Sequence, residues 1–456
     1  MKNLLAKIYE NMPVAMREKA SQLLLAHNIS IDNINRLIPQ YEVILKDSKS
    51  QQNSLPGQIY CILNIAKLFE LKKEHKVSLL CYNAGIALWC KYQTIQQSNK
   101  QINFFVASKD NNVDADFAVL TEALAGVTID SIMNETGLEP SVEHLSKHII
   151  DFRQRLVLIR QLAKNMLDEN KPGYDITKYI TDEFKALFLS IINYSIENLL
   201  GNDLKDVTWV PIGFGSMARD EMCPYSDIEY GFLYAKPETA EKEIAIKAYF
   251  RKLADLVELM IINMGETEFP ILTNDAIDLS RFKDNAHVLR HVIVKSTSPT
   301  PSGFSIDTAG LHPLGRQGVF ELIGTVDDFI TLATDETILE EYEHLSNALR
   351  TVCSMVNNTQ DTVHPLIQAY QHALSVTARP TREKQALQLL KPMLDKYKPP
   401  LDEERSHERY FQIKKELYRL ISMSFECLSF FMDLNKNSTK DRINALYDRE
   451  ILKDKG

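Results

Sequence analysis

The sequence predicts an α+β protein, mostly helical overall, in which a mixed sheet with helices mostly on one side lies between two helical flanks. Apolar residues recur at helical spacing through the first 170 residues and again from residue 336 onward. Between them, residues 207–235 contain two short runs rich in β-branched and aromatic residues, which is typical of strands. We therefore expect three domains: 1–174 (helical), 175–332 (the core with the sheet) and 333–456 (helical).

The composition is that of an ordinary globular protein, with 456 residues, 45% hydrophobic and 25% charged. A net charge of −9 argues against nucleic acid as the main partner, because proteins that bind the phosphate backbone need a basic surface. The six cysteines form no C-x-x-C pair, and no apolar run reaches the ~18 residues of a membrane span. We expect a soluble cytoplasmic protein without a membrane segment.

The N-terminal flank is predicted to consist of helices at 14–27, 34–46, 57–74, 76–95 and 141–168. His144 and His148 are four residues apart on the last of these and could share a metal ion, but no third ligand follows at a readable spacing. We interpret them as surface or half-buried histidines. His287 and His291 receive the same interpretation.

Two long helices are expected to pack around the sheet of the core. The first, Thr181 to Leu200, is amphipathic and is stopped by Gly201. The second begins at Pro237 and ends at Gly265, because proline is favoured in the first turn and glycine just past the end.

A glycine-rich turn follows the first predicted strand, Val207 to Phe214. Gly213 and Gly215 permit a sharp turn and the close approach of a ligand to the backbone. Ser216 is predicted to be the N-cap of a short helix, whose free N–H groups could bind a phosphate.

An acidic pair occupies the second predicted strand, residues 226–234. Asp227 and Glu229 are two residues apart, so their side chains point to the same face of the strand. Two neighbouring carboxylates repel each other unless a cation lies between them, which indicates a divalent metal site with magnesium as the first candidate.

Beyond residue 265 the sequence is less informative. Short strands are expected at 268–272 and 304–307, the second followed by a Gly/Pro-rich loop. After residue 336 we expect helices, a proline-rich break from Arg379 to Pro400, a final helix near 402–434 and a frayed polar tail at 435–456.

The segment GSMARDEMCPYSDIEYGFLY resembles the Gly-Ser-x-x-Arg-x-Glu-x-x-x-x-Ser-Asp-x-Asp/Glu signature of the DNA polymerase beta-like nucleotidyltransferase superfamily. It looks most similar to the branch with protein-PII uridylyltransferases, glutamine synthetase adenylyltransferases and related nucleotidyltransferase-like proteins. Ala218 matches the small residue usual before the arginine, whereas Glu229 stands where aspartate is more common. The resemblance covers roughly residues 180–330.

The resemblance implies transfer of AMP or UMP from ATP or UTP to a hydroxyl, with Mg²⁺ or Mn²⁺ as cofactor. Asp227, Glu229 and a third carboxylate would bind the metal, while Gly215 and Ser216 would hold the phosphates. Arg219 either contacts a phosphate or braces Glu221 within the turn. For the third carboxylate we choose Asp307, with Asp275 and Asp278 as alternatives, and a chain without a third acid is also considered.

The resemblance also suggests a protein side-chain hydroxyl as acceptor, recognised by the helical flanks. The chain lacks the His-Asp doublet and the sensor modules that accompany complete uridylyltransferases, so the substrate could differ. Two other classes stay open: a catalytically inactive nucleotide-binding or interaction protein, and a transferase acting on a small molecule or on a nucleic-acid end. The negative net charge of the chain disfavours a nucleic-acid end as the acceptor.

Overall fold

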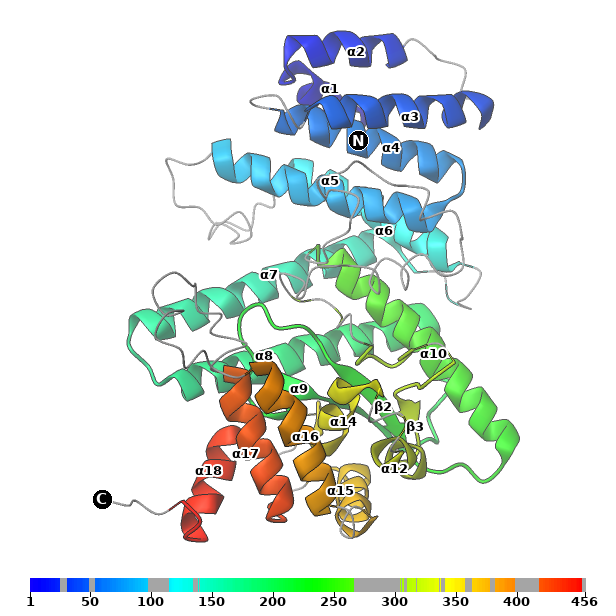
Figure 1. Ribbon diagram of the computed structural model, residues 1–456. Helices are drawn as coiled ribbons and strands as arrows, with labels where there is room; N and C mark the ends of the chain where they lie inside the picture. The colour runs from blue at the N-terminus through cyan, green and yellow to red at the C-terminus, as the bar shows by residue number, and fades with distance from the viewer. Residues whose placement is uncertain are drawn as a thin grey trace.

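The computed structural model describes residues 1–24, 31–48, 54–96, 115–133, 138, 140–265, 304, 306, 310–316, 318–335, 337, 341–356, 363–377, 382–397 and 418–452. In these ranges the chain is mostly helical around a small four-stranded mixed sheet, which confirms the predicted fold class. Figure 1 shows the N-terminal helices stacked at one end and the C-terminal helices at the other, with the sheet between them. None of the helices in these ranges combines the length and hydropathy of a membrane span.

The described residues before the core form seven helices: α1 Lys2–Glu10, α2 Val14–Leu24, α3 Ile31–Ser48, α4 Leu55–Leu71, α5 His75–Gln96, α6 Ala115–Ile132 and α7 Val142–Asp168. The five predicted helices are confirmed, whereas α1 and α6 were not predicted. Helix α1 buries only Leu4 and Ile8, so its apolar stripe is short. Helix α6 is apolar around much of its circumference, which weakens the helical period in the sequence.

The core elements follow in the predicted order: α8 Gly173–Tyr194, the π-helix η1 Ser195–Leu200, β1 Trp209–Gly213, α9 Gly215–Ala218, β2 Tyr230–Tyr234 and α10 Ala240–Asn263. Gly201 ends η1 with a φ of 88° and Gly265 follows α10 with a φ of 80°, as predicted for glycines past helix ends. The predicted start of α10 at Pro237 was wrong. Thr239 caps this helix, and its side chain accepts a hydrogen bond from the Lys242 N–H.

The sheet has the order β3-β2-β1-β4, with β3 at Ile323–Gly324 and β4 at Cys353–Ser354. Strands β1 and β2 are antiparallel, and Gly213 lies opposite Tyr230. Strand β3 runs parallel to β2, and β4 runs antiparallel to β1. Neither β3 nor β4 was predicted, because two residues are too few to show an alternating pattern.

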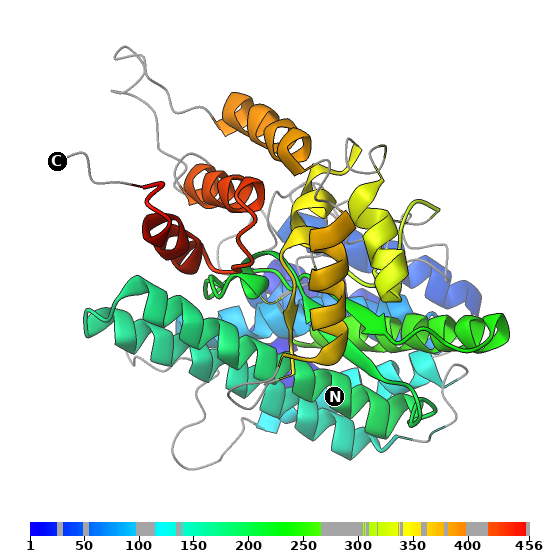
Figure 2. The same cartoon turned by 90° about the horizontal axis from the view of Figure 1, so that it is seen from below.

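Both faces of the sheet are covered by helices, so the expectation that most helices lie on one side was wrong. On one face, Phe232 stacks on Phe250 of α10 with ring centroids 5.0 Å apart. On the other face, Val210 and Leu233 pack in a second core with α12 Val326–Thr334 and α15 Pro365–Thr377. Figures 1 and 2 show these two helices on the opposite side of the sheet from α8. The cause is that apolar residues of β1 and β2 alternate between the two faces and fill both.

The C-terminal part contains α14 Glu343–Arg350, α16 Arg382–Tyr397, α17 Arg419–Phe431 and α18 Thr439–Asp448. The predicted break at 379–400 was wrong, because α16 continues through Pro392. The predicted frayed tail was also wrong in its first half. Ser438 caps α18, and Arg442 and Leu446 of that helix are buried. Residues 401–417, the start of the predicted final helix, lie outside the described residues.

Candidate active site

The glycine-rich turn connects β1 to the four-residue helix α9. Phe214 has an extended backbone and is the N-cap of α9. Its N–H donates to the Glu229 carbonyl oxygen at 3.0 Å, so the pairing of β1 with β2 continues to this residue. Ser216 is therefore the second residue of α9 and not its N-cap, which corrects the prediction. The first N–H groups of a helix have no acceptor within it, so those at Gly215 and Ser216 are suited to an anion.

Glu229 lies directly against this turn. A Cβ added at Gly215 would come within 1.7 Å of the Glu229 carboxylate oxygen Oε2. Gly215 also has a φ of 53°, in the left-handed region that favours glycine. The turn thus requires glycine for two independent reasons, and one of them is the carboxylate itself.

The two acids flank a buried residue just before β2. Ile228 is fully buried and forms a parallel bridge with Ile306, while Asp227 and Glu229 are half-buried. Strand β2 begins at Tyr230, so the acids precede the strand that was predicted to contain them. The alternation of buried and half-buried residues nevertheless continues through them, as expected for extended backbone.

The structure does not describe the other acids and two of the histidines considered in the sequence. Asp307, Asp275, Asp278, His287 and His291 lie outside the described residues. Among the residues that the structure describes, no group of three or more His, Cys, Asp or Glu side chains could hold a metal ion. The acidic pair supplies two carboxylates, which are the hard oxygen ligands that Mg²⁺ and Mn²⁺ prefer.

His144 and His148 belong to an aromatic cluster on α7. Their ring centroids are 4.3 Å apart, and the His148 ring lies 4.3 Å from that of Tyr194. The His148 ring nitrogen Nδ1 is also 2.9 Å from the His144 carbonyl oxygen. These contacts agree with the interpretation of both histidines as half-buried or surface residues.

Arg219 contacts Glu221, which is the contact expected for a bracing role, while contact with a phosphate stays a prediction. Its Nε donates to Glu221 Oε2 at 3.0 Å, and the two side chains are 16% and 12% exposed. Burial opposes the charge on Arg219, but Glu426, Tyr418 and Glu221 together raise its pKa above the usual range. The guanidinium is therefore held as a cation beside the glycine-rich turn.

The loop between the turn and the acidic pair is held by α7 and α8. The Met222 N–H donates to the Thr181 hydroxyl at 3.1 Å. Arg160 donates from Nε to the Pro224 carbonyl at 2.7 Å, and its guanidinium lies 4.4 Å from the ring centroid of Tyr225. Sequence reasoning missed both supporting residues, because they belong to helices far from the motif and match no pattern of their own.

Lys185 of α8 places a second cation near α9. Its Nζ lies 3.3 Å from Asp220 Oδ1, and the residue is almost fully buried. Burial opposes the charge, but Cys353 and Asp220 raise the pKa of Lys185 above its usual value. Asp220 itself has a φ of 57°, in the left-handed region.

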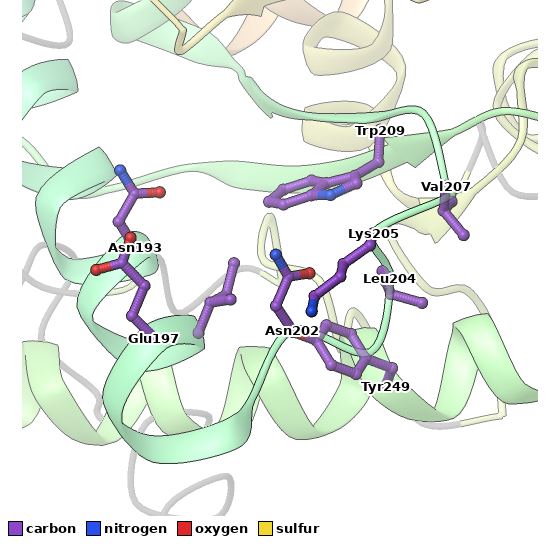
Figure 3. Close-up of a pocket in the computed structure, with 9 residues that line it drawn as sticks. Asn193, Glu197, Asn202, Leu204, Lys205, Val207, Trp209 and Tyr249 are labelled. Carbon is purple, nitrogen blue, oxygen red and sulfur yellow. The ribbon is translucent and has the colours of Figure 1, made fainter.

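A pocket of about 250 Å³ lies at the other end of β1 (Figure 3). Trp209, Tyr249 and the polar residues Glu197 and Lys205 line it. Trp209 begins β1, whereas the glycine-rich turn follows its last residue, so at ~3.3 Å per residue the two are roughly 13 Å apart along the strand. The pocket is therefore separate from the candidate active site.

Comparison with known families agrees with the motif. A family model described as Putative nucleotidyltransferase DUF294 matches residues 158–269. The matched part contains the glycine-rich turn, the acidic pair and the helices on either side of them. A search of curated proteins found no match to the chain. The family match supports a nucleotidyltransferase domain in this part of the chain, while the narrower likeness to uridylyl- and adenylyltransferases stays a prediction.

Proposed function

We propose that this chain is a metal-dependent nucleotidyltransferase that moves AMP or UMP from a nucleoside triphosphate to a hydroxyl group. The observation that carries the proposal is the contact between the Glu229 carboxylate and the Gly215 turn. It brings a metal-binding group and a set of backbone N–H donors together, which is what a metal-bound triphosphate needs. The family match over the same residues supports the class of reaction.

Each residue of the proposed site has a separate task. The backbone at Gly215 and Ser216 would donate hydrogen bonds to the triphosphate, and Arg219 would keep the turn in place through Glu221. Asp227 and Glu229 would hold Mg²⁺ or Mn²⁺. When bound, the ion would neutralise negative charge on the phosphates and on the leaving pyrophosphate.

For the third carboxylate we retain Asp307. Support comes from the parallel bridge between Ile306 and Ile228, the residue between the two acids. Successive side chains of extended backbone point to opposite faces, and Asp307 follows Ile306 in sequence just as Glu229 follows Ile228. Its role would be to accept the proton of the attacking hydroxyl.

The acceptor is proposed to be a protein side-chain hydroxyl. The supports are the likeness of the motif to protein-modifying transferases and the extensive helical flanks on both sides of the core. A nucleotide-binding protein without transferase activity is the second candidate, because no group of three or more His, Cys, Asp or Glu side chains in the described residues could hold a metal ion. A small-molecule hydroxyl is the remaining alternative acceptor.

The experiment is incubation of the protein and a cell lysate with Mg²⁺ and either ATP or UTP labelled at the α-phosphate. Label that runs with protein and depends on Asp227 supports the proposal. Label on a small molecule changes the acceptor. Nucleotide binding without transfer of label or pyrophosphate release would establish the second candidate.

A further inference from the structure

The C-terminal helices contact the nucleotidyltransferase motif through one carboxylate. Glu221 Oε2 accepts from the Tyr418 hydroxyl at 2.7 Å, and Oε1 accepts from the Thr439 backbone N–H at 3.0 Å. Thr439 is the first residue of α18, so Glu221 binds the positive end of this helix. The same carboxylate holds Arg219 beside the phosphate-binding turn.

A second set of contacts fastens the same helices to the strand beside β1. Thr351, two residues before β4, donates to Glu426 of α17 at 2.9 Å. Arg442 of α18 donates to the Thr351 hydroxyl at 2.6 Å and lies 3.7 Å from Glu426. All three residues are buried. Figure 1 shows α17 and α18 next to each other, below α8.

These contacts join charged groups that would be costly to bury alone. Removing one partner of a buried pair leaves the other without compensation, so the helices and the turn should move as a unit. The motif thereby depends on residues about 200 positions away in sequence.

We propose that Glu221 is a positioning residue through which α17 and α18 set the nucleotide affinity of the Gly215–Ser216 turn. The inference rests on the proposed function, because it assumes that this turn holds the triphosphate. Displacement of α18 releases Glu221, and Arg219 then loses the partner that keeps it beside the turn. By reciprocity, nucleotide binding stabilises the docked position of α17 and α18.

Thr439→Pro tests this coupling at a single N–H group. Proline is favoured at the first position of a helix, and Ser438 before it has φ −75° and ψ 147°, which a following proline accepts. The substitution removes only the backbone donor to Glu221, together with the Thr439 hydroxyl. Thr439→Ala removes the hydroxyl and keeps the donor, so it is the matched control.

The readout is the dissociation constant of ATP and of UTP analogues with a methylene bridge between the α- and β-phosphates, measured with Mg²⁺. We expect Thr439→Pro to weaken binding at least five-fold and Thr439→Ala to leave it unchanged. Tyr418→Phe, which removes one side-chain donor, should weaken binding about two- to three-fold. Arg449→Ala removes an exposed hydrogen bond to the Met432 carbonyl at the other end of α18 and keeps both donors to Glu221, so it should leave binding unchanged.

Hydrogen exchange of the unmodified protein gives a readout that needs no substitution. The analogue with Mg²⁺ should slow exchange in α17 and α18, while α1 and α2 serve as an internal control. The inference would be overturned if Thr439→Pro and Thr439→Ala bound the analogue equally well and nucleotide did not change exchange in α17 and α18. The proposed function would then remain intact. If the unmodified protein binds neither analogue, the proposed function fails and this inference fails with it.

Discussion

Gly215 combines a backbone requirement with a steric one. Its φ of 53° disfavours any other residue, and the Glu229 carboxylate occupies the position where a Cβ would project. We expect Gly215→Ala to displace Glu229 and to lower the nucleotide affinity at least ten-fold, measured by titration with the methylene analogue and Mg²⁺.

Gly126→Ala is the control for this substitution. Gly126 lies inside α6, and a Cβ there would have no atom within 4 Å. Alanine should therefore leave affinity unchanged and stabilise the protein by up to ~1 kcal/mol. Full affinity in Gly215→Ala would show that the turn does not hold the phosphates.

Asp227 is one of the two acids of the proposed metal site. We expect Asp227→Asn to reduce transfer of the α-phosphate label by about 10²-fold or more, because a proposed metal ligand is lost, while the melting temperature changes little. Activity that is normal in both Asp227→Asn and Glu229→Gln would contradict the assignment of the metal site.

Glu221 gives the site a pH dependence. Burial favours its neutral form, but Arg219 and the hydrogen bonds from Thr439 and Tyr418 lower its pKa below the ordinary 4.5. The stabilisation is therefore present above pH 4.5 and is lost as the pH falls through the folded pKa. The melting temperature of the unmodified protein should exceed that of Glu221→Gln at neutral pH, and the difference should shrink below pH 4.5. A difference that is constant down to pH 3 would contradict this.

Residues of the candidate site could be predicted where they lie close together in the sequence. Gly215, Asp227 and Glu229 belong to one 20-residue motif, and the structure brings Gly215 and Glu229 into contact. The partners of Glu221 could not be predicted, because Tyr418 and Thr439 are ordinary residues whose role appears only when α17 and α18 fold against the motif.

At the scale of elements, long amphipathic helices such as α7 and α8 were predictable because their apolar period extends over many turns. The sheet was only partly predictable, since β3 and β4 have two residues each and form through pairing with β2 and β1. Helix α18 was missed because its surroundings are polar and its few apolar residues show no clear stripe.

Helix α8 should control the position of the loop that leads to the acids. Thr181→Val keeps the shape of the side chain but leaves the Met222 N–H without its acceptor, at a cost of ~1–3 kcal/mol. We expect a lower melting temperature and several-fold weaker nucleotide binding. Thr121→Val is the matched control, since the buried Thr121 hydroxyl bonds only to the Phe117 carbonyl of its own helix in the described part of the chain. Equal effects on affinity would refute a specific role for Thr181.

At the scale of the whole molecule, the predicted boundary at residue 174 crosses a continuous core. One cluster of buried apolar residues extends from Leu4 in α1 through α8 and α10 to Met355. A buried polar network crosses the same boundary. Asn83 of α5 donates to the Asn263 side chain at 3.1 Å, and Arg153 of α7 donates to the Asn263 carbonyl at 2.8 Å.

This continuity leads to a prediction about cooperativity. The chain has two tryptophans, Trp89 in α5 and Trp209 in β1, so Trp209→Phe and Trp89→Phe each leave one fluorescent reporter, in the N-terminal helices and in the core respectively. We expect both reporters to show the same unfolding midpoint in urea. Asn83→Leu should lower both midpoints together, because it leaves Asn263 and Arg153 with fewer buried partners, at a cost of ~1–3 kcal/mol. Separate midpoints, with only the Trp89 reporter shifted by Asn83→Leu, would instead mean that residues 1–174 and 175–332 unfold as independent domains.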